Sequence, residues 1–221
     1  MLMSHGSDWD FGLSGLAKRF HGPWDHEGTL AGTVMAAATD RRGEAPGSAA
    51  RGILEDARRL SGASLPSETV ALLWLAATGR GCDLDHLGID AGDWLRQIAA
   101  ICAEHLQRLG ESVPAAVAPQ RAADSAADDV VREIQAARSA LTEEIRNRRG
   151  YELEGVVPAL EQVATEVDPD LGFRLFLRVM IAYWVPISRD QYDRYLAMGE
   201  RFGYGRFHVD DAEFLTELRK R

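Results

Sequence analysis

The amino-acid sequence predicts an all-α protein made of two small helical units. Apolar residues recur at steps of three and four along most of the chain, and residues suited to helix capping precede several of these stretches. Residues 111–124 form a Pro/Ala-rich segment without an apolar period, which predicts a linker. We therefore expect one unit at residues 8–110 and a second at 125–221. With 221 residues, 46% of them hydrophobic, the chain has enough apolar surface for a packed core.

The first unit is expected to contain five helices. A Gly-Pro turn separates the first two, and either Asp25 or Thr29 caps the second. Pro66 suits the first turn of the fourth helix. Asp90 is the expected N-cap of the fifth, with Asp93 in a first turn whose dipole favours negative charge. The expected ranges are 11–20, about 29–39, 48–60, 66–78 and 91–109.

In the second unit, each helix is expected to begin at a capping residue or a proline, since both suit a first turn. The predicted starts are Ser125, Pro158, Asp168–Pro169, a capping box at Ser188–Gln191, and Asp210 with Glu213. Residues 207–209 have the composition of a very short strand, but no other segment is a convincing partner for it.

Charge and composition exclude some classes of function. The net charge is −9 and the isoelectric point about 5.2, which argues against a nucleic-acid binder and suits a basic protein partner. Two cysteines do not indicate a disulfide framework. No signal peptide is recognised, and the longest apolar windows are too short to span a bilayer. We expect a cytoplasmic protein without membrane contact.

Residues 20–28 are predicted to form a tight corner between the first two helices. In the structural interpretation, Trp24 fills the core, Asp25 caps the following helix and His21 bonds to a backbone carbonyl. In the alternative, His21 and His26 belong to a metal or acid–base site. They stand five apart across a Gly-Pro turn, which does not match the usual spacing of zinc ligands on a helix.

This corner carries a family resemblance. The stretch from Leu16 to Thr29, including Phe20-His21-Gly-Pro-Trp24-Asp25, resembles the opening of the CdiI-type immunity proteins of bacterial contact-dependent growth inhibition. Residues 81–85 together with Trp94-Leu-Arg-Gln-Ile resemble the helix that closes that domain. The resemblance covers residues 8–110 and implies a protein that masks a cognate toxin domain, often a nuclease. Family members are typically about as long as the first unit, and residues 125–221 match no family.

No catalytic or cofactor motif is recognised, so no enzyme and no cofactor are predicted. The chain has no P-loop, dinucleotide fingerprint or Gly-x-Ser-x-Gly sequence. Cys102 and His105 stand three apart on one helix face, but two ligands do not make a metal site. Cys82 and Cys102 are expected to behave as small buried hydrophobes.

Acidic residues gather near the start of the fifth helix, and tyrosines recur in the second unit. The acidic residues form either a solvated rim or a patch that captures a basic toxin surface. The tyrosines are either core residues or interface anchors. The candidate partner-binding residues are Asp83, Asp85, Asp90, Asp93, Glu104, Tyr192, Tyr195 and Tyr204.

Two other functions remain open at this stage. Residues 48–99 loosely resemble a Clp N-terminal helical repeat, which implies a helical adaptor or regulatory protein-binding domain. A metal-dependent enzyme built on His21 and His26 is the third reading. The oligomeric state is not predicted.

Overall fold

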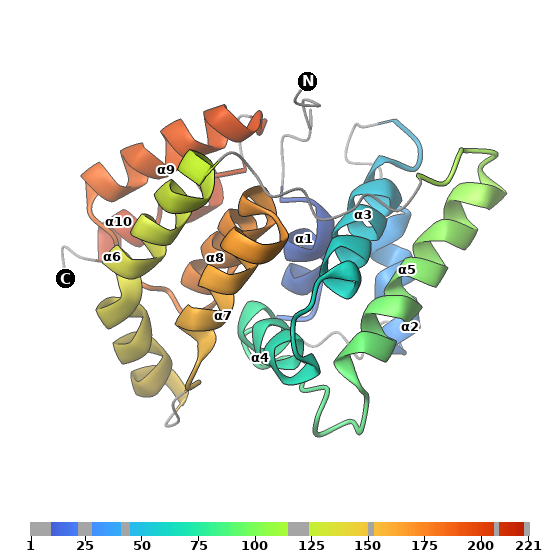
Figure 1. The fold of residues 1–221 in the computed structure, drawn as a ribbon, viewed down its shortest axis with the longest axis horizontal. Coiled ribbons are helices and arrows are strands. Elements are labelled where there is room, and N and C mark those ends of the chain that lie inside the picture. The colour runs from blue at the N-terminus through green and yellow to red at the C-terminus, as the bar shows by residue number, and fades with distance from the viewer. Residues whose placement is uncertain are drawn as a thin grey trace.

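A computed structural model describes residues 10–21, 28–40, 45–114, 124–149, 153–205 and 208–218, and all regular structure within these ranges is helical. The all-α prediction is confirmed there. None of the described helices has the length and apolar character needed to cross a bilayer. In Figure 1, α5 lies at one edge of the molecule and α6 and α9 at the opposite edge, with α1, α4 and α8 between them. The elements are α1 Gly12–Arg19, α2 Leu30–Ala38, α3 Ser48–Gly62, α4 Ser67–Ala77, α5 Ala91–Arg108, α6 Asp124–Arg149, α7 Val156–Gln162, the π-helical turn η2 Val163–Val167, α8 Pro169–Ala182, α9 Arg189–Phe202, the 3-10 turn η3 Asp210–Ala212, and α10 Leu215–Leu218.

Capping hydrogen bonds confirm several predicted helix starts. The hydroxyl of Thr29 accepts from the backbone N–H three residues on at 2.9 Å, so Thr29 caps α2; Asp25 lies outside the described residues. Asp168 caps α8 in the same way at 2.9 Å. Ser188 and Gln191 make both hydrogen bonds of the capping box, at 3.1 and 2.9 Å.

Other predicted starts are wrong. α6 begins one residue before Ser125, whose hydroxyl accepts a hydrogen bond from Arg201 at 3.0 Å instead of acting as N-cap. α7 begins two residues before Pro158, which is tolerated there because the first N–H groups of a helix have no intrahelical acceptor. Pro66 is the N-cap of α4 rather than its first residue.

The C-terminal segment also differs from its prediction. Asp210 begins η3, and the last helix, α10, follows only at Leu215. His208 and Val209 form a turn and not a strand, while Phe207 lies outside the described residues. Val209 is 3% exposed, so this turn packs into the core through its side chain.

The two predicted units share one continuous hydrophobic core. α8 contacts α1 and α4, and α7 contacts α4. At this junction Leu13, Leu73 and Leu175 help to line an apolar cavity of about 20 Å³. That volume holds about one water molecule, so the cavity is a packing defect and not a ligand site. The parts of the chain before and after residues 111–124 pack against each other, so the structure does not separate them into two units. The division into domains stays a prediction.

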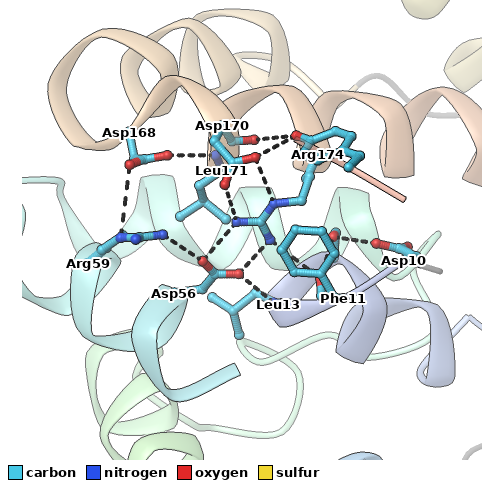
Figure 2. A network of polar contacts seen from close by, with 11 residues as sticks. Asp10, Phe11, Leu13, Asp56, Arg59, Asp168, Asp170, Leu171 and Arg174 are labelled. Carbon is cyan, nitrogen blue, oxygen red and sulfur yellow. Dashed lines mark hydrogen bonds and ion pairs between the residues drawn. The ribbon is translucent and has the colours of Figure 1, made fainter. Parts of the chain in front are cut away.

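A buried ionic network crosses the same junction, as Figure 2 shows. Arg174 of α8, whose side chain is 1% exposed, donates to the two carboxylate oxygens of Asp56 at 2.6 and 2.9 Å. Asp56 lies on α3, is 2% exposed, and also accepts from the backbone N–H of Leu13 at 2.9 Å. Gly12 adopts φ 62°, and a Cβ there would stand 1.9 Å from Asp56 Oδ2. Glycine is therefore required where α1 approaches this carboxylate.

Further contacts complete the network. Asp170 lies 3.1 Å from Arg174, and the Arg174 guanidinium stands 4.4 Å from the centre of the Phe11 ring. Tyr204 donates from its hydroxyl to Asp170 at 2.6 Å. Burial lowers the pKa of Arg174, but Asp170 and Asp56 outweigh it and hold that pKa well above its ordinary value. Burial, followed by the charge of Asp170, raises the pKa of Tyr204 well above its usual range.

Candidate protein-binding surface

The loop between α4 and α5 carries most of the acidic residues singled out in the sequence. Overlapping backbone hydrogen bonds fold residues 83–89 into one continuous turn. The N–H of Leu87 donates to the carbonyl of Asp83 at 3.1 Å, and that of Ile89 donates to the carbonyl of Leu84 at 2.9 Å. The Asp83 carboxylate accepts from the backbone N–H of His86 at 3.0 Å. Asp83 is thus a turn-forming residue whose side chain is committed to its own loop.

Buried contacts attach this loop to the core. Cys82 and Leu84 are each 1% exposed. Gly81 packs so closely on the end of α1 that a Cβ would stand 1.8 Å from the carbonyl oxygen of Phe20. Because its ends and its interior are both fixed, the loop presents its exposed residues in a preorganised arrangement.

Two of the acidic residues begin α5. Asp90 accepts from the backbone N–H of Asp93 at 2.9 Å and from the Ser67 hydroxyl at 2.6 Å, which confirms it as the N-cap. The Ser67 hydrogen bond, followed by that from Asp93, lowers the pKa of Asp90 and keeps it ionised. Asp93 pairs with Arg96 one turn on, and both side chains are 67% exposed.

The loop tip combines charge with an exposed apolar side chain. Asp85 and His86 are exposed, and Leu87 between them and Gly88 is 44% exposed. Glu104 is also exposed, but it lies eleven residues after Asp93 on α5, about 16 Å along the helix axis. Asp83, Asp85 and Asp90 thus lie on the α4–α5 loop and Asp93 in the first turn of α5, while Glu104 lies further along the same helix.

The predicted tyrosines lie elsewhere. Tyr192 is 2% exposed and donates to Asp210 at 3.1 Å, and Tyr195 is 0% exposed. Tyr204 belongs to the Arg174 network and stacks on Phe173 with ring centres 6.2 Å apart. Tyr192 and Tyr195 pack in the core of the C-terminal half, and Tyr204 is partly buried against it, so these side chains offer little surface to a partner.

The two ends of the family-like region meet in space. Phe20 and Trp94 are each fully buried and lie edge to face at 6.0 Å, and Trp74 packs against both at 5.4 and 5.6 Å. His21 lies beside Gly79, where a Cβ would stand 2.3 Å from its ring. Trp24, Asp25 and His26 lie outside the described residues.

No metal centre emerges in the part of the chain that the structure describes, where no three His, Cys, Asp or Glu side chains are grouped to hold an ion. Cys82 and Cys102 are free and buried, as expected of small hydrophobes. Burial raises the pKa of the Cys102 thiol to about 12 and also raises that of Cys82.

Two structurally prominent features were not predicted. The Asp56–Arg174 pair had one signal in the sequence, since Arg174 and Arg178 stand four apart within the most apolar helix of the chain. Arg178 is also buried and donates to the carbonyl of Ala77 at 3.1 Å. The exposed Trp184 had no such signal, because it follows an apolar helix and reads as its last core residue.

The comparisons with known proteins add no relative. No family model, no curated protein and no solved structure matches the chain.

Proposed function

We propose that this chain is an immunity protein that binds a cognate bacterial toxin domain through a basic surface of that domain and masks its active or substrate-binding surface. The observation that carries the proposal is the preorganised segment at residues 83–93, which comprises the end of the α4–α5 loop and the first turn of α5. It carries acidic side chains together with the exposed Leu87. The resemblance of residues 8–110 to CdiI-type immunity proteins supplies the class of partner. The toxin's target lies in the cytoplasm in this proposal, and inhibition is stoichiometric.

The physical basis is electrostatic capture followed by apolar contact. Opposite charges on the two proteins raise the association rate, and a nuclease surface that binds phosphates is basic. A loop that is already ordered loses little conformational entropy on binding. Leu87 at the tip then buries apolar surface that solvent now contacts.

Co-expression is the first test. The toxin domain encoded beside this chain is expressed in a sensitive bacterium with and without the full chain, and the complex is then purified. Survival with a complex of defined stoichiometry supports the proposal. Survival without a complex indicates an indirect or enzymatic antidote, and no rescue from an active toxin leaves the helical adaptor as the better reading.

Charge reversal then locates the surface. Asp85→Lys changes an exposed side chain and should slow association about tenfold and weaken its salt dependence. Leu87→Ser should mainly speed dissociation. Glu143→Lys makes the same change in net charge at an exposed side chain of α6, the helix at the edge of Figure 1 opposite α5, and is the matched control. Equal effects of Asp85→Lys and Glu143→Lys would remove the loop from the interface.

A further inference from the structure

The end of α8 contains a residue that does not suit its backbone. Two hydrogen bonds close the helix, from Trp184 to the carbonyl of Ile181 at 3.2 Å and from Val185 to that of Met180 at 3.0 Å. This pattern is the Schellman motif, whose left-handed position is usually glycine. Here Trp184 occupies it with φ 54°.

The left-handed conformation of Trp184 costs folding stability. A left-handed conformation disfavours a residue with a side chain by a factor of roughly five to thirty in the folding equilibrium. Burial offsets this only in part, because Trp184 is 48% exposed. Strained backbone combined with an exposed aromatic ring is more typical of a binding site than of a core.

A second exposed aromatic residue lies beside it. Phe214 is 40% exposed, and its ring stands edge to face with that of Trp184 at 6.1 Å. The next residue, Leu215, is fully buried, and its carbonyl accepts from the backbone N–H of Ile187 at 3.3 Å. Both aromatic rings are thus attached to fixed backbone, and we call them the Trp184–Phe214 patch.

The rim of this patch is acidic. Glu213 precedes Phe214, and Glu217 follows it by three residues, which places Glu217 on the same face. Both carboxylates are exposed. Among the described residues, Arg189 is a cation beside the patch, and it is paired with Glu213 at 3.1 Å and with Asp193 at 3.2 Å. Glu217 is in no ion pair among the described residues, so its carboxylate leaves a negative charge beside the Phe214 ring.

We propose that the Trp184–Phe214 patch is a docking surface for an arginine-bearing basic segment of a protein partner. A guanidinium stacks on the indole face and pairs with Glu217, which combines a cation–π contact with a charge-assisted hydrogen bond. A second copy of this chain is the less suitable occupant, because two acidic rims would repel each other. The patch lies in the C-terminal half and does not depend on the loop at residues 83–93.

The test uses the full-length chain and a fluorescent peptide of alternating arginine and glycine, followed by anisotropy at physiological salt. Trp184→Gly leaves the net charge unchanged and should raise the Kd roughly three- to thirtyfold, the range expected of a cation–π contact. Glu217→Gln should also weaken binding. Glu68→Gln makes the same charge change as Glu217→Gln at an exposed position of α4 and should leave the Kd within about twofold. Binding that is insensitive to Trp184→Gly, or equally sensitive to Glu68→Gln, overturns the proposal.

Thermal unfolding checks the backbone argument. Trp184→Gly and Trp184→Ala both remove the indole. Glycine adopts the left-handed conformation without strain and alanine does not, so the glycine variant should have the higher Tm. The opposite order would overturn the argument from strain. Sedimentation of the wild-type chain detects self-association, and a dimer that Trp184→Gly dissociates would make this patch an interface between two copies instead. Survival of toxin-expressing bacteria is measured separately with the Asp85→Lys variant. The immunity proposal and the docking proposal can therefore fail independently.

Discussion

Replacing Asp56 by alanine is expected to lower the free energy of unfolding by about 4 kcal/mol. Removing one partner of a buried ion pair costs roughly 3–5 kcal/mol, because the other charge stays buried. Arg174 retains Asp170 at 3.1 Å and the Phe11 ring at 4.4 Å, which places the loss near the lower end of that range. The buried N–H of Leu13 also loses its acceptor, which adds roughly 1–3 kcal/mol.

Urea and thermal unfolding, followed by far-UV circular dichroism and tryptophan fluorescence, measure this loss. A chain of this size loses roughly 2–4 °C in Tm per kcal/mol, so Asp56→Ala should lower the Tm by about 8–16 °C. The control is Asp193→Ala, which removes an exposed ion pair with Arg189 at 3.2 Å and should change stability by less than about 1 kcal/mol. Because the network and the core join both halves, the two probes should report one coincident transition.

A double variant separates the charge from the shape. Asp56→Leu combined with Arg174→Met removes both buried charges and should recover most of the loss, except for the part due to the Leu13 N–H. A loss for Asp56→Ala no larger than that of Asp193→Ala would refute the role given to the network. Two separate unfolding transitions in the wild-type chain would instead show that the halves fold independently.

Three further predictions concern ionisable groups. Burial, followed by the neighbouring charge of Asp170, raises the pKa of Asp168, so ionisation of this carboxyl group destabilises the fold as the pH rises through that pKa. Asp168→Asn keeps a good N-cap and cannot ionise. In urea titrations, this variant should therefore gain stability relative to wild type from about pH 4 upward. The Cys102 thiol, with a pKa of about 12, should react with an alkylating reagent at pH 8 roughly a thousandfold more slowly than an ordinary thiol, as measured by mass spectrometry, and rapid labelling of the folded chain would contradict its burial. Arg194→Ala should lower the free energy of unfolding by about 1–3 kcal/mol, because it leaves the 6% exposed Glu133 carboxylate of α6 without its partner on α9. An unchanged midpoint in chemical unfolding would show that the pair contributes nothing.

Local signals predicted the fold class and the N-caps of four helices. Thr29, Asp90, Asp168 and the Ser188–Gln191 box are caps whose hydrogen bonds close within three residues, so the sequence window contains both partners. The start of α7 was predicted wrongly because a proline is acceptable anywhere in a first turn and does not mark which residue begins it.

Side-chain roles were harder to predict. Tyr192 and Tyr195 have a helical spacing that suits either a core or an interface, and only packing against other helices decides between them. The acidic residues divided in the same way, since Asp83 and Asp90 stabilise their own turn and helix while Asp85 remains exposed.

The sequence by itself determined that this protein is helical, acidic and capped at identifiable residues, because those properties depend on composition and on neighbours a few positions apart. Only the tertiary structure decided that the two halves share a core, that Asp56 meets Arg174, and that Trp184 stays half exposed beside Phe214. Asp56 and Arg174, and likewise Trp184 and Phe214, are separated by many residues in the chain. Their contacts depend on how whole helices pack. Periodicity specifies which face of a helix is apolar, but it does not specify which other helix covers that face.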